Sequence, residues 1–216
     1  MLGRWDLNWG RYTHELEQEV DWLQQKWNEF RELFAKGAER IELLNTVAPN
    51  FFYMLHKLMF EDAMLHLCRL TDSSQTKVRV GKRVETRNNL SVMALADLIS
   101  DNALKKRVTA QAIQVKKNCK FAREPRNRRL AHADLESFRN GADGPKILSK
   151  HVEDALKSMH EILGLIREHY GYPPSALMKD PFGAKSLLYY LESAVRVETA
   201  ARRNPHIRAA ILNGRE

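Results

Sequence analysis

The sequence predicts an all-α fold, and three observations support this prediction. Only 10 glycines and 7 prolines occur among the 216 residues, and proline is absent between Phe51 and Glu124. Apolar residues recur at spacings of three and four through most of the chain, which is the period of an amphipathic helix. A chain of this length can also bury a hydrophobic core without disulfides or structural metal ions. We therefore expect one all-α domain over residues 1–216, a helical bundle of four main helices with extra helices at both ends.

The N-terminal helices are expected over residues 11–48. In the first of them, acidic and amide side chains separate the apolar positions, and Gly37 ends the pattern. The apolar positions are Tyr12, Leu16, Val20, Leu23, Trp27, Phe30 and Phe34. A shorter apolar helix follows and ends at Pro49.

Residues 51–70 are predicted to form the central buried helix, because apolar side chains surround it on nearly every face. We expect this helix to end at residues 71–74. Residues 73–89 are polar and basic, and we interpret them as a long exposed loop. Asn89 is the expected N-cap of a short helix over residues 92–99.

The next predicted helix, residues 104–122, has one apolar seam and one basic stripe. The seam residues are Leu104, Val108, Ala112, Val115, Cys119 and Ala122. Lys116, Lys120 and Arg123 stand at i, i+4 and i+7 beside this seam. Pro125 ends or kinks the helix, because proline lacks an N–H and restricts the residue before it.

The last part of the chain predicts two further helices. Residues 139–146 contain Asn-Gly and Asp-Gly-Pro and are interpreted as a loop. An amphipathic helix with apolar positions over residues 152–166 follows and ends near Gly171. A C-terminal helical appendage is expected over residues 175–202, with its helix beginning at about Ala184.

Positive charge is concentrated in one region of the chain. The formal net charge is +8 and the isoelectric point is near 9.5. Residues 102–132 contain ten cations and the single acid Glu124. This distribution favours a polyanionic partner, either nucleic acid or an anionic membrane surface.

Cysteine usage and hydropathy predict a soluble cytoplasmic protein. Cys68 and Cys119 lie in apolar helical patterns without the spacing of a zinc site, so both are expected to be reduced core residues. No apolar signal region follows Met1, and no apolar run approaches the roughly 18 residues of a membrane span. The motifs of a Rossmann site, a P-loop and a hydrolase elbow are also absent from the sequence.

The segment from Arg126 to His132 contains the side chains of greatest chemical interest. Arginine supplies a planar cation that can bind a phosphate at two points, and histidine titrates near neutral pH. On one continuous helix, their six-residue separation would place the two side chains on different faces. The helix break at Pro125, or a second copy of the chain, could bring them together. The alternative is that the arginines form a solvated basic face and His132 caps a turn.

The R-N-x4-H pattern at the end of a basic helix in an all-α bundle resembles the signature of the HEPN superfamily (higher eukaryotes and prokaryotes nucleotide-binding domain). The segments Arg69–Asp72 and Arg129–Asp134 are similar to the abortive-infection, phage-resistance branch of that superfamily. The resemblance covers an HEPN-like core of about residues 50–170.

This resemblance implies a metal-independent endoribonuclease without a cofactor, acting as a toxin or phage-defence effector. Attack by the RNA 2′-OH would leave 2′,3′-cyclic phosphate and 5′-OH ends. Arg126 and His132 would be the catalytic residues. The expected substrate-binding residues are Asn127, Arg129, Lys116, Lys120 and Arg123.

The expected partners are RNA, a second copy of the chain and an antitoxin protein, with no membrane. The composite site would lie between the two copies of a homodimer. A different class of function stays open, namely a non-catalytic HEPN-like module that binds RNA, nucleotide or a protein partner. A helical scaffold or transcriptional regulator has less support, because no helix-turn-helix pattern with a convincing recognition helix is present.

Two other pairs of residues have structural explanations. Asp62 and His66 stand at i, i+4 and could be an acid/base pair or metal ligands, but no third ligand has suitable spacing. A buried histidine bound by its neighbour is the favoured interpretation. Arg69 and Asp72 are expected to form an i, i+3 ion pair at a helix end.

Overall fold

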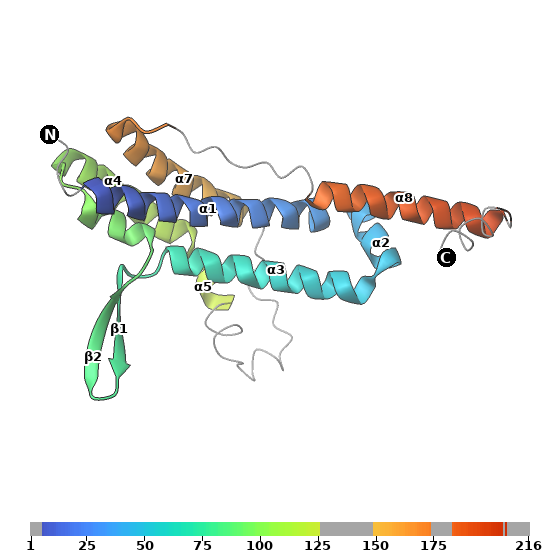
Figure 1. Cartoon of the computed structure of the whole chain (residues 1–216), viewed down its shortest axis with the longest axis horizontal. Helices are drawn as coiled ribbons and strands as arrows, with labels where there is room; N and C mark the ends of the chain where they lie inside the picture. The colour runs from blue at the N-terminus through green and yellow to red at the C-terminus, as the bar shows by residue number, and fades with distance from the viewer. Residues whose placement is uncertain (1–5, 126–148, 174–182, 205, 207–216) are drawn as a thin grey trace. The chain divides into compact units, whose positions relative to one another are not determined.

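The computed structural model describes residues 6–125, 149–173, 183–204 and 206 (Figure 1). In chain order its elements are α1 (Asp6–Phe34), α2 (Ala38–Val47), α3 (Pro49–Leu70), β1 (Gln75–Val80), β2 (Arg83–Asn88), the 3-10 helix η1 (Val92–Leu98), α4 (Asn102–Asn118), α5 (Lys120–Pro125), α7 (Ser149–Tyr170) and α8 (Ala184–Arg203). Helices make up nearly all of the regular structure in these ranges. The predicted all-α fold is therefore confirmed.

The chain forms two compact units, and each is assembled from two separate stretches of sequence. The first unit comprises residues 1–26 and 60–177, and the second comprises residues 27–59 and 178–216. Both α1 and α3 contribute residues to each unit. The single domain expected from the sequence stays a prediction.

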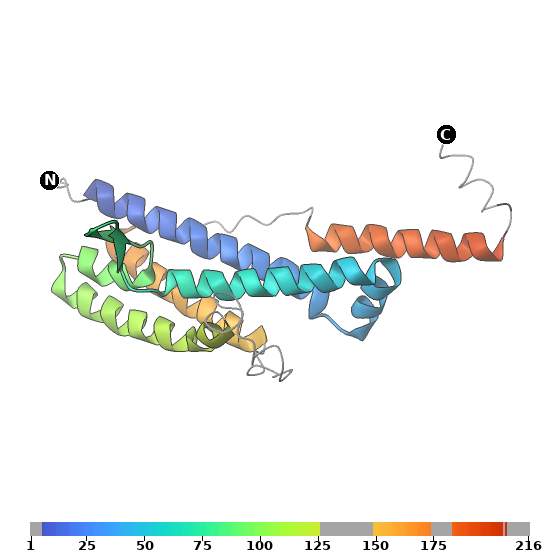
Figure 2. The ribbon, with the colours of Figure 1, turned by 90° about the horizontal axis from the view of Figure 1, so that it is seen from below.

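The first unit is a helical bundle whose core consists of the predicted apolar seams. Its main helices are α4 and α7, the N-terminal part of α1 and the C-terminal part of α3, and α4 packs against α7 and η1 (Figures 1 and 2). The buried apolar residues of α4 and α7 are Leu104, Val108, Ala112, Val115, Val152, Ala155, Leu156, Met159, Ile162, Leu163 and Ile166. Each large apolar side chain removed from water contributes about 1.5–3 kcal/mol to folding. The predicted bundle of four main helices is confirmed.

Residues 75–88 form a β-hairpin, so the prediction of a long loop over residues 73–89 was wrong. The strands β1 and β2 pair antiparallel from Gln75 opposite Asn88 to Val80 opposite Arg83. Gly81 has a φ of +61° and provides the positive φ that two-residue hairpin turns require. Valine and threonine alternate with charged residues here, which favours strands even though neither face is apolar.

The short helix after the hairpin is η1, and Ser91 rather than Asn89 caps it. The Ser91 side chain accepts a hydrogen bond from the backbone N–H of Met93 at 3.1 Å. Asn89 closes the hairpin instead, because its Nδ2 donates to the carbonyl oxygen of Ser73 at 2.8 Å. The expected Asn89 cap was therefore wrong by two positions.

The second unit has its own apolar core, to which α2, α8 and parts of α1 and α3 contribute. The buried residues of this core are Leu33, Leu44, Phe52, Ala184 and Leu188. The N-cap residue of α8, Gly183, has no side chain to cap the helix, and the carboxylate of Glu29 accepts a hydrogen bond from the N–H of Ala184 instead. A Cβ at Gly183 would collide with that carboxylate.

The N-terminal half of α3 is exposed on one side, so the prediction of a helix buried on all faces was wrong. Phe51, Met54 and Leu58 are 53%, 53% and 56% exposed. They stand at i, i+3 and i+7, and therefore form one stripe along the helix. Apolar composition alone does not specify how many sides of a helix are covered within one chain.

Among the described residues, no helix combines the length and apolar character that crossing a bilayer requires.

Candidate functional site

The first described stretch, residues 6–125, ends immediately before the Arg-His motif. Arg126, Asn127, Arg129 and His132 lie outside the described residues. The structure therefore shows the frame that leads into the motif. That frame consists of the end of α4, the short helix α5 and the groups that hold α5 in place.

The basic helix is divided before it reaches the motif. Residues 104–122 were expected to form one helix, but α4 ends at Asn118 and α5 begins at Lys120. Cys119 lies between them with φ −90° and ψ 1°, outside the helical range. The N–H of Ala122 then bonds the carbonyl oxygen of Cys119 at 3.1 Å, a tighter turn than in an α-helix. The basic helix is therefore interrupted seven residues before Arg126.

Arg123 attaches α5 to the end of α3. Its Nη1 donates to Oδ1 of Asp72 at 2.8 Å, and its Nη2 donates to the carbonyl oxygen of Thr71 at 2.8 Å. Nη2 also lies 3.1 Å from the Thr71 hydroxyl oxygen. Hydrogen bonds to a charged group are stronger than neutral ones. Arg123 thus anchors the chain three residues before Arg126.

The groups that accept hydrogen bonds from Arg123 belong to the two residues that follow the last residue of α3. The last carbonyls of a helix have no partner within it, and a cation is favoured beside them. Thr71 is fully buried, and its hydroxyl donates to the carbonyl oxygen of Leu67 at 2.8 Å. From the sequence, we expected Asp72 to form an ion pair with Arg69. In the structure, Asp72 forms an ion pair with Arg123 instead. Arg69 lies 3.5 Å from the carboxylate of Glu19.

Two of the expected substrate-binding residues, Lys116 and Lys120, lie within the described part of the chain. Both side chains are exposed, on the last turn of α4 and at the start of α5. Lys117 beside them is exposed as well. These lysines provide positive charge close to the motif in sequence, whereas Arg123 points to the end of α3.

The two cysteines are core residues, as predicted. Cys68 and Cys119 are free thiols, and both are buried. Burial, together with the neighbouring Cys68, raises the pKa of Cys119 to about 12. A thiol with this pKa stays protonated at neutral pH and is a poor nucleophile.

A ring contact joins the helices on either side of the motif segment. The rings of Phe121 in α5 and His151 in α7 have centroids 5.4 Å apart. Phe121 precedes Arg126, and His151 follows the described start of α7 at Ser149. The helix α5 and the start of α7 therefore lie next to each other.

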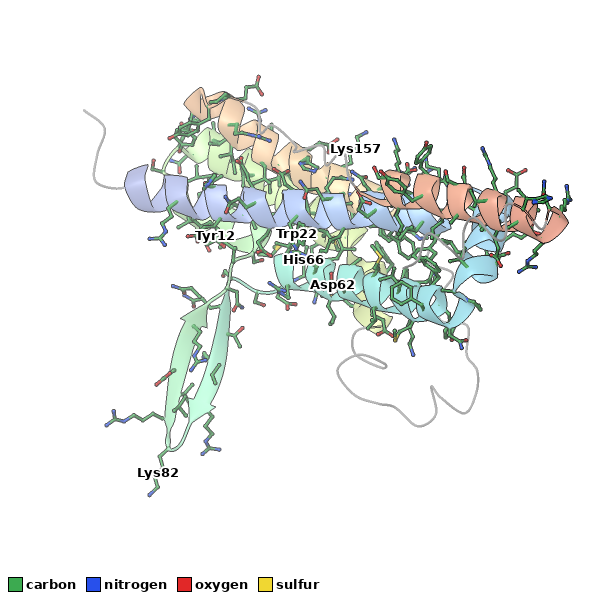
Figure 3. All side chains as sticks on the ribbon, turned by 45° about the vertical axis from the view of Figure 1, so that its right-hand side comes forward. Tyr12, Trp22, Asp62, His66, Lys82 and Lys157 are labelled. Atoms are coloured by element: carbon green, nitrogen blue, oxygen red, sulfur yellow. The ribbon has the colours of Figure 1, made fainter. Side chains whose placement is uncertain are left out.

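His66 belongs to a polar cluster between α1 and α3 in the first unit (Figure 3). Lys26 donates to Asp62 and lies 3.1 Å from His66 Nδ1. Nε2 of the buried His66 lies 2.8 Å from Oε2 of Glu19, without the alignment of a hydrogen bond. Burial lowers the pKa of His66, and Lys26 lowers it further.

This cluster supports the structural interpretation of Asp62 and His66. The ammonium group of Lys26 occupies the position between them that a shared metal ion would need. Within residues 6–125, 149–173, 183–204 and 206, His, Cys, Asp and Glu side chains form no group of three or more that could hold a metal ion.

The helical bundle and the basic frame before an Arg-His segment define a protein of the HEPN class. A family model described as AbiU2 (HEPN_AbiU2) matches residues 6–181 of the chain. This match covers most of the sequence, and the chain belongs to the HEPN AbiU2 family, in the abortive-infection branch. Neither a curated protein nor a solved structure matches the chain.

Proposed function

We propose that the protein is a metal-independent endoribonuclease whose catalytic residues are Arg126 and His132. The observation that carries this proposal is the family match over residues 6–181, which includes the R-N-x4-H motif. The exposed Lys116 and Lys120 and the anchored α5 add support, because they bring positive charge and a fixed entry point to the motif.

RNA provides the nucleophile for this reaction. The 2′-oxygen attacks the adjacent phosphorus, the bond from phosphorus to the 5′-oxygen breaks, and the 2′-proton is lost while the 5′-oxygen gains one. The products are a 2′,3′-cyclic phosphate and a 5′-hydroxyl. The enzyme needs to align the 2′-oxygen, transfer protons and stabilise the extra negative charge on the phosphate.

His132 would transfer the protons, and Arg126 would stabilise the charge. A positioned acid or base typically contributes about 10²–10⁴ in rate. The planar guanidinium of Arg126 can donate two parallel hydrogen bonds to the phosphate oxygens. Asn127 would orient Arg126 or the substrate.

Backbone binding is assigned to Arg129, Lys116, Lys120 and Arg123, which would track the RNA phosphates. Lys116 and Lys120 are exposed and can reach a ligand without rearrangement. Arg123 already donates to Asp72 and Thr71. Its contribution to binding would therefore come through the position it gives α5, in addition to its charge.

A homodimer would complete the site. On one continuous helix Arg126 and His132 would face different directions, and a second copy of the chain would supply the missing partner of each pair. The exposed stripe of Phe51, Met54 and Leu58 supports a protein partner, because exposed apolar patches often mark interfaces.

In the cell, such an enzyme would act as a toxin or phage-defence effector in the cytoplasm, with RNA as its substrate. An antitoxin protein would restrain it.

The test is cleavage of a labelled RNA by the purified protein in EDTA. Wild type should cleave, and His132→Ala and Arg126→Ala should bind RNA without cleaving it. His14→Ala is a matched control that removes an exposed histidine of α1, outside the motif and the helices next to it. If wild type binds RNA but leaves it intact at high protein concentration, the chain is a non-catalytic binding module.

A further inference from the structure

The hairpin of β1 and β2 is the most strongly cationic element that the proposed site does not use. Between Gln75 and Asn88 it has one acid, Glu85. Its five cations are Lys77, Arg79, Lys82, Arg83 and Arg87. All five cations are exposed.

The strand register distributes these cations over the whole ribbon. Lys77 and Arg79 lie on one face, because alternate residues of a strand point to the same side. Arg83 and Arg87 lie on the other face, and Lys82 is at the tip (Figure 3). Cations two residues apart on a strand are about 7 Å apart, which is close to the separation of successive phosphates along an extended nucleic-acid strand.

The hairpin contributes little to the core of the first unit. It extends away from the helices of that unit in Figure 1. Val78 is its only part-buried residue, whereas Val80 and Val84 are 46% and 65% exposed. A two-stranded ribbon of this kind is marginally stable by itself. Its charge and exposure therefore suit a binding role better than a structural one.

Hydrogen bonds at the base hold the hairpin in a defined position. The Tyr12 hydroxyl accepts from the N–H of Ser91 at 2.8 Å and lies 3.0 Å from the carbonyl oxygen of Asn89. The Ser91 hydroxyl donates to the carbonyl oxygen of Asp72 at 2.6 Å. Arg123 donates to the carboxylate of the same Asp72. The base of the hairpin and the helix before the motif are thus attached to one residue.

We propose that the hairpin over residues 75–88 is an RNA-binding arm that contacts the phosphate backbone without base specificity. This inference rests on the proposed ribonuclease function, and it extends the binding surface beyond Lys116 and Lys120. Sequence-independent phosphate contacts suit a ribbon of lysine and arginine that contains no aromatic residue for base stacking. Its only apolar side chains are three valines, with no aromatic, leucine or isoleucine residue, and this composition disfavours insertion into a membrane.

The test uses His132→Ala protein, so that RNA binding is measured without cleavage. The arm variant carries Lys77→Thr, Arg79→Thr, Lys82→Thr and Arg83→Thr, since threonine suits a strand. The matched control removes four cations from the exposed side of α8, with Lys185→Gln, Arg196→Gln, Arg202→Gln and Arg203→Gln. Both variants should show the wild-type helix content and melting temperature, which excludes misfolding as the cause of any change.

We expect the arm variant to bind a labelled single-stranded RNA at least tenfold more weakly at moderate salt. The slope of log affinity against log salt should fall by about 2–3, at roughly 0.7 per lost phosphate contact. The α8 control should change affinity less than threefold. Glu85→Gln should bind more tightly than its parent, because it removes the one acid of the arm.

Two results would overturn the inference. One is unchanged RNA affinity and salt slope in the arm variant. The other is hairpin-dependent binding to phosphatidylserine vesicles with RNA affinity unchanged, which would assign the arm to a membrane. If wild type fails to cleave RNA but the arm variant still binds RNA more weakly than its parent, the nuclease proposal is wrong and the RNA-binding role of the hairpin is supported.

Discussion

Arg123 in α5 donates a hydrogen bond to Asp72, 51 positions earlier in the chain, at 2.8 Å. This contact joins the helix that leads into the Arg-His motif to the residue that follows α3. The base of the basic hairpin bonds to the backbone of the same Asp72 through Ser91. One residue, Asp72, is therefore bonded to two of the elements that we propose to bind RNA.

Removing this contact should reduce stability. Arg123→Ala and Asp72→Ala should each lower the free energy of unfolding in urea by about 1–2 kcal/mol, because each removes a charge-assisted hydrogen bond between two partly buried side chains. The double variant should lose less than the sum of the two single variants. Strict additivity would show that the two side chains are not coupled. Arg11→Ala, at an exposed i, i+4 pair with Glu15, should cost much less.

Two leucines of α3 should differ sharply in their effect on stability. Leu67 is fully buried, and Leu67→Ala should lower the free energy of unfolding by about 2–5 kcal/mol. Leu58 is 56% exposed, and Leu58→Ala should cost well under half as much in dilute protein. Equal losses of unfolding free energy for the two variants, measured by urea denaturation, would contradict the one-sided exposure of this helix.

Lowering the pH should reduce the free energy of unfolding, in part because His66 becomes protonated. Burial lowers the pKa of this imidazole in the folded state, and Lys26 and Arg69 lower it further, against the opposing effects of Glu19 and Asp62. The unfolded chain, with a histidine pKa of about 6.5, therefore binds a proton at a higher pH than the folded chain does. This contribution to stability is full above the unfolded pKa and is lost as the pH falls below it.

The measurement is the free energy of unfolding between pH 8 and pH 5. His66→Gln should flatten the decline, and a residual slope should persist because burial also lowers the pKa of His56 and His160. Leu67→Ala is the control, since it destabilises the protein without removing a titrating group. An unaltered slope in His66→Gln would refute this account of the buried histidine.

Mixing inactive variants tests whether the site is composite. Arg126→Ala and His132→Ala should each be inactive alone. A heterodimer of the two retains one arginine and one histidine on opposite subunits, so the mixture should regain cleavage activity. Arg126→Ala mixed with the double variant should not regain it. Absence of recovery, with heterodimers verified by native mass spectrometry, would place each site within one chain.

The sequence predicts the bundle well because its seams are regular. In α4 and α7, apolar residues at three- and four-residue spacing lie between polar ones, and every predicted seam position is buried. The exposed stripe of α3 was missed because Phe51, Met54 and Leu58 have the same composition as core residues. Only a tertiary structure distinguishes a covered face from an uncovered one.

The frame of the site was less predictable. The hairpin was missed although valine and threonine alternate with charged residues along each strand, because the strand register leaves charges on both faces of the ribbon and no apolar face toward a core. Arg123 fits a basic helical stripe with Lys116 and Lys120, and nothing local in the sequence indicates that Asp72 binds it. Ion pairs between distant segments depend on packing, which helical spacing does not encode.

The most direct test of the central proposal is the dependence of cleavage on the RNA 2′-OH. Wild type should cleave an RNA oligonucleotide in EDTA and leave 2′,3′-cyclic phosphate and 5′-OH ends, detected by mass spectrometry. The same oligonucleotide with 2′-deoxyribose at the cleaved position should stay intact there, and His132→Ala should cleave neither. Cleavage at the deoxy position, or products with 5′-phosphate ends, would contradict the account.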